Sequence, residues 1–179
     1  MTRNNHRLVR TLAGIFLAGS AGAVVAQPAP PPPQQTTATY EDWIVRCETH
    51  QGPPQQKTCE MVQYTQMKGQ TGIISQVAIG RPVKGQPIKL VIQVPIGVWL
   101  PTGVKLAIGA KDAAIAASFK RCLPAGCFSD ADIKDDTIRK FRAMTEAGQL
   151  QFKDAAQKDV SLPVSFKGFG AAWDALSKD

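Results

Sequence analysis

Residues 119–128 read Phe119-Lys120-Arg121-Cys122-Leu123-Pro124-Ala125-Gly126-Cys127-Phe128. A Pro-Ala-Gly segment between two short apolar stretches is typical of a tight turn joining two strands. A disulfide between Cys122 and Cys127 would tie both strand ends together and fix the register of their sheet. We therefore expect a covalent clasp here, at the end of a strand that begins at Ile115, and we expect the rest of the domain to be organised around it.

The first 26 residues have the pattern of a secretory signal peptide. Three arginines within residues 1–10 precede an apolar run of small residues, which ends at Ala26 before Gln27. An uncleaved membrane anchor is the alternative, but the run is shorter than the ~20 residues that a spanning helix needs. We predict a mature protein without a transmembrane segment, located in the periplasm or at the cell surface, or secreted.

Positive charge is spread along the chain. The formal net charge of the whole sequence is +7, and removal of the three arginines of the signal lowers it to +4. The densest basic group, Arg139-Lys140-Arg142, falls on a predicted helix. Because proteins that bind nucleic acid concentrate their basic residues on one face, this scattered charge predicts no nucleic-acid partner.

The four cysteines of the chain all lie after the predicted cleavage site. An even number of cysteines in an exported protein predicts disulfides. Of the three possible pairings we favour Cys47–Cys59 and Cys122–Cys127, because a turn-like segment separates the members of each pair. Zinc is the alternative, but the spacings lack the usual paired motif of structural zinc sites, and a Cys-x-x-Cys redox motif is absent. We predict two structural disulfides, no metal and no cofactor.

Residues 27–39 are rich in proline, glutamine and threonine and predict an extended linker. The folded domain is therefore expected to span residues 40–179. Apolar and polar residues alternate from Trp43 to Cys47, as in a half-buried strand. Further strands are predicted at 59–66, 73–79, 88–94, 104–108, 115–122, 150–152 and 160–166. Short strands separated by turn residues favour a β-sandwich or barrel.

Two short helices interrupt this pattern. The first is expected to be capped by Asp135 or Asp136 and to run to about residue 147, with Gly148 as its stop. The second is C-terminal, and its apolar residues form one stripe, which favours a lid on the core over a groove for a partner. The stripe consists of Phe169, Ala172, Trp173 and Leu176.

Residues typical of catalysis are few. His50 is the only histidine after the signal, it is expected in a polar loop between Cys47 and Cys59, and no Gly-x-Ser-x-Gly motif accompanies it. The one acidic cluster precedes the first predicted helix, where acids are favoured by the helix dipole; a metal site is the alternative. It comprises Asp130, Asp132, Asp135 and Asp136. We assign no catalytic residue and predict that the protein is not an enzyme.

Trp99 and Leu100 are the candidate interface residues. They stand before Pro101 at a predicted turn, where an aromatic side chain is placed for contact with another protein. For Trp99, burial in the core is favoured, and an exposed anchor at an interface is the alternative.

Several segments together resemble the invasion-associated locus B family of bacterial envelope proteins. They are Trp43-Ile44-Val45-Arg46-Cys47 with Cys59, residues 100–106, the Cys122–Cys127 clasp, and residues 165–172. The likeness extends over residues 40–176, and the four cysteines match those of the family. The proline-rich tract before residue 40 is not part of the shared pattern.

The resemblance implies an immunoglobulin-like β-sandwich in the envelope of a Gram-negative bacterium, binding an unknown envelope or host-surface protein and linked to invasion of host cells. It implies no catalytic or ligand residue. Two alternatives remain: a hydrolase of envelope polymers, which would act through the aspartates at residues 130–136, and a carrier of a small ligand, which would need an apolar cavity between the sheets.

Overall fold

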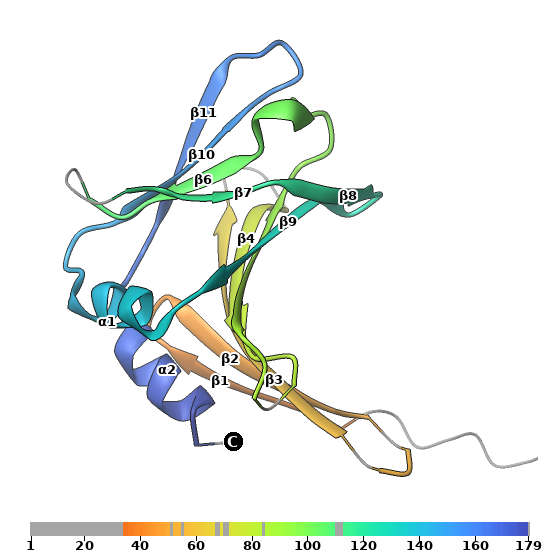
Figure 1. Cartoon of the computed structure of the whole chain (residues 1–179), viewed down its shortest axis with the longest axis vertical. Helices are drawn as coiled ribbons and strands as arrows, with labels where there is room; N and C mark the ends of the chain where they lie inside the picture. Colours follow the sequence, from red (N-terminus) through yellow and green to blue (C-terminus); the bar gives the residue numbers. More distant parts are fainter. Residues whose placement is uncertain are drawn as a thin grey trace, which may run out of the picture. The chain divides into compact units, whose positions relative to one another are not determined.

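The computed structural model describes residues 34–50, 52–54, 56–66, 69, 72–83, 85–109 and 113–178. The predicted signal peptide and the first part of the predicted linker, residues 1–33, lie outside the described residues. The fold is a sandwich-like pair of antiparallel sheets with two short helices, one of them C-terminal, as predicted. Figure 1 shows the smaller sheet across the upper part of the larger one.

The larger sheet has seven strands, and its spatial order is β1-β2-β3-β4-β5-β9-β8. Their bounds are β1 Gln34–Tyr40, β2 Trp43–His50, β3 Gln56–Gln66, β4 Ile73–Gly80, β5 Ile88–Val94, β8 Phe119–Leu123 and β9 Gly126–Ile133. Burial alternates along β2 and β5 because one face of the sheet meets the core and the other meets solvent.

The smaller sheet has four strands in the order β11-β10-β6-β7. Their bounds are β6 Val104–Ala107, β7 Ile115–Ala117, β10 Gly148–Lys153 and β11 Asp159–Val164. The single strand predicted over residues 115–122 is wrong. Its first part pairs with β6 and its second with β9, so the chain changes sheets at Ser118. A continuous stretch of β-prone residues does not reveal such a change of partner.

The predicted linker is wrong at its C-terminal end. Residues 34–39, which were assigned to it, form β1 together with Tyr40 and pair with β2 in unbroken antiparallel register. The low apolar content of this segment suggested a tether. However, a strand that is added to the edge of an existing sheet is held by backbone hydrogen bonds, which do not require apolar side chains.

Helix α1 spans Asp135–Ala143 and is shorter than predicted. Lys134 occupies the N-cap position without a side-chain hydrogen bond, so neither Asp135 nor Asp136 is the cap; both lie in the first turn. Gly148 does not stop the helix but begins β10. A Cβ at Gly148 would come within 2.8 Å of the carbonyl oxygen of Ala107, so this glycine permits close packing of β10 on β6.

Helix α2 (Phe169–Leu176) is a lid over the core, as its apolar stripe predicts. Phe169 is fully buried, and its ring meets Trp43 edge-on at a centroid distance of 5.2 Å. The indole N–H of Trp43 donates to the carbonyl oxygen of Ser165 at 2.9 Å. The buried Gln63 side chain donates to the same carbonyl and accepts from the Ser165 N–H, at 2.9 and 2.8 Å. These bonds join the segment before α2 to β2 and β3.

Candidate functional site

Both disulfides join directly opposed residues on neighbouring strands. Cys47 faces Cys59 across β2 and β3, and Cys122 faces Cys127 across β8 and β9. This is the local pairing that the sequence predicts. The clasp at residues 122–127 is nevertheless not the centre of the fold: β8 is an edge strand that pairs only with β9. The expectation that the domain is organised around the clasp is wrong, because the core is built on the interior strands.

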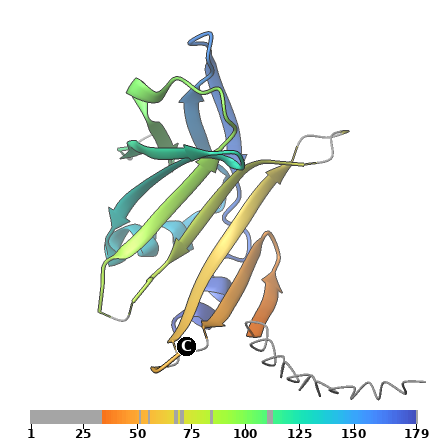
Figure 2. The same cartoon turned by 90° about the vertical axis from the view of Figure 1, so that its right-hand side faces the viewer.

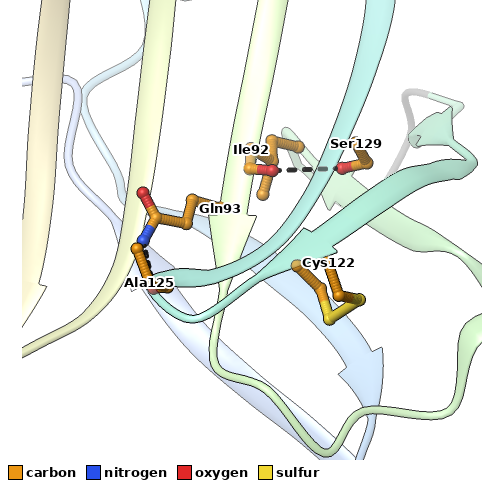
Figure 3. Close-up of a disulfide and its surroundings, with 6 residues drawn as sticks. Ile92, Gln93, Cys122, Ala125 and Ser129 are labelled. Carbon is orange, nitrogen blue, oxygen red and sulfur yellow. Dashed lines mark hydrogen bonds between the residues drawn. A yellow bond between two sulfur atoms is a disulfide. The ribbon is translucent and has the colours of Figure 1, made fainter.

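The turn of the clasp packs against the end of β5 (Figure 3). The Gln93 amide donates to the carbonyl oxygen of Ala125 at 2.6 Å. Gly126 has a φ of +148° and lies so close to β5 that a Cβ there would come within 2.5 Å of the Val94 carbonyl oxygen. The clasp is therefore held rigidly beside the segment that follows β5.

Exposed apolar side chains gather at this end of the molecule. The described chain has six exposed large hydrophobic residues, and four of them belong to the clasp turn or to the β5–β6 connection beside it. We call these four the clasp-end surface: Ile96, Trp99, Leu100 and Leu123, with exposures of 63%, 37%, 49% and 45%. The structure thus places the candidate interface residues Trp99 and Leu100 at the surface, and the favoured burial of Trp99 in the core is wrong. Sequence reasoning missed Ile96 and Leu123, because they join this surface only through the packing of the clasp turn on the end of β5, which strand and turn patterns do not reveal.

The backbone around Trp99 is well anchored. Its N–H donates to the carbonyl oxygen of Lys153 at 2.8 Å, and its carbonyl accepts from the Thr102 hydroxyl at 3.3 Å. Leu100–Thr102 form a short 3-10 helix, η1, which ends at Gly103. The side chains of Trp99 and Leu100 are therefore presented on a fixed backbone, which lowers the entropic cost of binding.

A groove of about 220 Å³ lies between η1 and β8. Leu100, Phe119 and Cys122 contribute to its walls, together with the basic residues Lys120 and Arg121. The Arg121 guanidinium lies 5.9 Å from the centre of the Phe128 ring. Neither Lys120 nor Arg121 forms an ion pair with any residue that the structure describes. The clasp-end surface is thus bordered by cations that are available to a partner.

The predicted acidic cluster is dispersed over separate ion pairs. Asp130 and Asp132 both face Lys89, at 3.5 and 2.6 Å. The hydrogen bond from Lys89 to Asp132 is the main cause of the raised pKa of this lysine. Asp135 pairs with Arg81 at 3.4 Å, and Asp136 pairs with Arg139. The hydrolase alternative needs converging carboxylates. Only Asp130 and Asp132 lie together, and Lys89 pairs with both, so the four aspartates do not form one acidic site.

No group of three or more His, Cys, Asp or Glu side chains is placed to hold a metal ion within the described part of the chain. His50 is the last residue of β2 and is exposed. The prediction that it lies in a loop is therefore wrong. The space between the sheets is filled by core side chains such as Leu90, Leu106 and Leu150, all fully buried. The core therefore offers no support for the carrier alternative.

A second groove, of about 450 Å³, lies on the outer face of the larger sheet. Its lining includes His50 and the Cys47–Cys59 pair, together with polar residues that sequence reasoning did not single out, such as Glu48 and Glu60. Arg46 of this groove makes two side-chain hydrogen bonds: Nε donates to Glu60 at 2.7 Å and Nη1 donates to the Tyr64 hydroxyl at 2.8 Å. The alternation along β2 and β3 places these side chains on one face, but only the register of the two strands brings them together.

These features define a class of protein: a small antiparallel β-sandwich with cross-strand disulfides and an exposed apolar end. Residues 43–177 match the family model of the Invasion associated locus B protein. The chain belongs to this family.

Curated relatives and a solved structure agree with this assignment. Two invasion protein B homologs of Brucella abortus, from strain 2308 and from biovar 1 strain 9-941, are each 28% identical over 172 residues, covering 96% of this chain and 96% of theirs. The crystal structure of invasion associated protein B from Bartonella henselae matches with a TM-score of 0.69 and 22% identity, over 80% of this chain and 95% of that one. This likeness supports the fold. Among the helices of the described residues, none has the length and apolar character needed to cross a membrane.

Proposed function

We propose that the protein is exported to the periplasm or cell surface of a Gram-negative bacterium and acts there by binding another protein through the clasp-end surface. Removal of residues 1–26 at export would leave residues 27–33 as a tether before β1. Two disulfides are suited to an oxidising compartment, and the relatives named above are invasion proteins. A binding role in contact between the bacterium and a host cell accords with both observations.

The clasp-end surface is the observation that carries this proposal. Scattered exposed apolar residues are normal on any protein, but a concentration of them marks a site of interaction. Here Trp99 and Leu100 stand on an anchored backbone beside cations that have no described ion-pair partner. Protein–protein interfaces typically have aromatic anchors at their centre and polar or charged residues at their rim.

Crosslinking in intact cells tests the proposal. The wild-type chain is compared with a Trp99→Ala/Leu100→Ser double variant and with a matched control, Ile73→Ser, which removes an apolar side chain that is 52% exposed outside the clasp-end surface. We expect wild type and control to crosslink to the same envelope or host-surface protein, and the double variant to lose it while its exported amount stays unchanged. Mass spectrometry of the recovered chains should show a mature N-terminus at Gln27.

Retention of the crosslinked protein by the double variant would show that the clasp-end surface is not the interface. Recovery of the wild-type chain without any partner would count against the binding role itself. A chain that retains residues 1–26 and stays in the cytoplasm would refute export.

A further inference from the structure

The two sheets end in four edge strands, β1, β8, β7 and β11. Edge strands carry unpaired backbone groups, and proteins protect them with charge, proline, bulges or short length. β7 has only three residues, β8 carries Lys120, Arg121 and a register shift, and β11 contains Asp159 and Pro163. β1 has none of these devices: it has seven residues without charge or proline, in unbroken register with β2.

Within the described part of the chain, residues 35–39 of β1 are covered on neither face of the sheet, whereas Tyr40 packs against the core. The side chains from Gln35 to Thr39 are all exposed, although they alternate between the two faces of the sheet. Figure 2 shows β1 in orange at the margin of the larger sheet, beside β2. Pairing with β2 is therefore the main interaction that holds residues 35–39 in the sheet.

The direction of the β1 backbone groups follows from the neighbouring disulfide. The Cα atoms of Cys47 and Cys59 are 4.0 Å apart, the short spacing of a pair that does not exchange hydrogen bonds. The backbone groups of Cys47 therefore point toward β1, where Cys47 faces Thr36. Hydrogen-bonded and non-bonded pairs alternate along the strand, so Gln35, Thr37 and Thr39 direct their N–H and C=O groups away from β2, to the open edge.

We infer that the edge of β1 is an interface with a second copy of this chain. The two β1 strands run antiparallel about a two-fold axis at Thr37, with each Thr37 opposite its counterpart and each Gln35 opposite a Thr39. This register uses all six backbone groups of the open edge on each strand, whereas a shift of two residues leaves some of them unpaired. The larger sheets of the two copies then form one continuous sheet.

The absence of charge on β1 and the short length of its open edge favour a second copy of the chain as the partner of this edge. β1 carries no charge, so identical strands do not repel, and threonine pairs across strands are favourable. On β8, by contrast, Lys120 and Arg121 would repel their counterparts in a second copy. The contact is also limited in length. Pro30–Pro33 have no N–H to donate, and Glu41, with a φ of +52°, turns the chain after Tyr40. An isologous contact of this kind closes at two copies.

Sedimentation of the mature chain, residues 27–179, over a range of concentrations tests the inference. We expect a dimer for the wild type and a monomer for Thr37→Pro, because this proline removes an N–H of the open edge without removing a bond to β2. Thr37→Lys should also be monomeric, because two lysines would face each other across the axis. Ser161→Lys, a matched change on the β11 edge, should leave the dimer intact.

Cysteine substitution tests the register. All cysteines of the described chain are paired, so an added thiol is the free one. Thr37→Cys should form a covalent dimer on mild oxidation, because residue 37 lies opposite itself, whereas Thr36→Cys should not, because residue 36 lies opposite residue 38. A monomeric wild type, a dimer that survives Thr37→Pro, or a covalent dimer of Thr36→Cys but not of Thr37→Cys would overturn the inference. None of these results depends on the clasp-end surface.

Discussion

The two ends of the domain use apolar residues in opposite ways. At the α2 end, Phe141, Phe166 and Phe169 form an aromatic cluster with Trp43, and the Phe141 ring lies 5.1 and 5.3 Å from those of Phe166 and Phe169. At the clasp end, Trp99 and its apolar neighbours are exposed. The comparison teaches that aromatic residues near turns stabilise the fold at one end and are available for binding at the other. The surroundings of an aromatic residue, and not its identity, decide whether it stabilises the fold or is available for binding.

The two disulfides repeat this contrast. Cys47–Cys59 ties two interior strands of the larger sheet, whereas Cys122–Cys127 ties an edge strand to its only neighbour. The second disulfide fixes a turn beside the clasp-end surface. We therefore expect changes at the α2 end and at either disulfide to act on stability, and changes of the exposed side chains of the clasp-end surface to act mainly on binding.

The largest expected effect is at the α2 end. Phe169→Ala should lower the free energy of unfolding by about 3–5 kcal/mol, because it removes a fully buried ring that packs against three others. Trp99→Ala should lower it by less, about 1–2 kcal/mol, because its side chain is 37% exposed and only partly packed. Urea denaturation of the mature chain measures both. Equal losses of unfolding free energy in the two variants would show that the aromatic residues at the two ends do not differ in their role.

Loss of each disulfide should have a smaller effect. The residues joined are 12 apart for Cys47–Cys59 and 5 apart for Cys122–Cys127. The loop-entropy relation then gives losses of about 3 kcal/mol for Cys47→Ser and about 2 kcal/mol for Cys122→Ser. The second variant should also be exported in lower yield. Thermal unfolding measures the losses, and an unchanged midpoint for Cys122→Ser would show that the clasp does not stabilise the fold.

Thiol mapping by mass spectrometry checks the pairing in the same variants. Cys47→Ser should free Cys59 alone, and Cys122→Ser should free Cys127 alone. Release of any other thiol would contradict the local pairing.

The smallest expected effect is in the pH dependence of the α2 end. Arg142 of α1 donates to both carboxylate oxygens of Asp174 on α2, with Nη2 to Oδ2 at 3.1 Å. These bonds hold the pKa of Asp174 below its ordinary value of 3.8. The carboxylate thus binds a proton more readily in the unfolded chain. Its stabilising contribution is present above the unfolded pKa and is lost as the pH falls through the lowered folded pKa.

Urea midpoints measured from neutral pH into this acid range test the ion pair. The midpoint of the wild type should fall more steeply with acid than that of Asp174→Asn, which has no carboxylate to protonate. Arg142→Gln, which removes the donor, should give the same shallower slope. Identical slopes in all three proteins would show that the pair does not link α1 to α2 in solution.

Much of the local structure could be predicted from single residues and their spacing. Alternation along Trp43–Cys47 identified the buried face of β2, and the stripe from Phe169 to Leu176 identified a lid. The candidate site was predicted only in part. Pro101 and the turn marked Trp99 and Leu100, but Ile96 and Leu123 join them only because the clasp turn packs on the end of β5. The pairing of β10 with β6 likewise depends on a strand distant in sequence, whereas β1 pairs with β2 across a two-residue turn.

The sequence by itself determined the periodicity of the strands, the turns, the cysteine partners that lie across those turns, and the likeness to the family. These features arise from the conformational preferences of neighbouring residues and from short-range spacing. Only the tertiary structure decided that the clasp lies at a sheet edge, that β1 joins the sheet, and that the aspartates separate. The physical reason is that side-chain periodicity specifies which face of a strand is buried but not which strand lies beside it. That choice is made by packing and register across the whole chain.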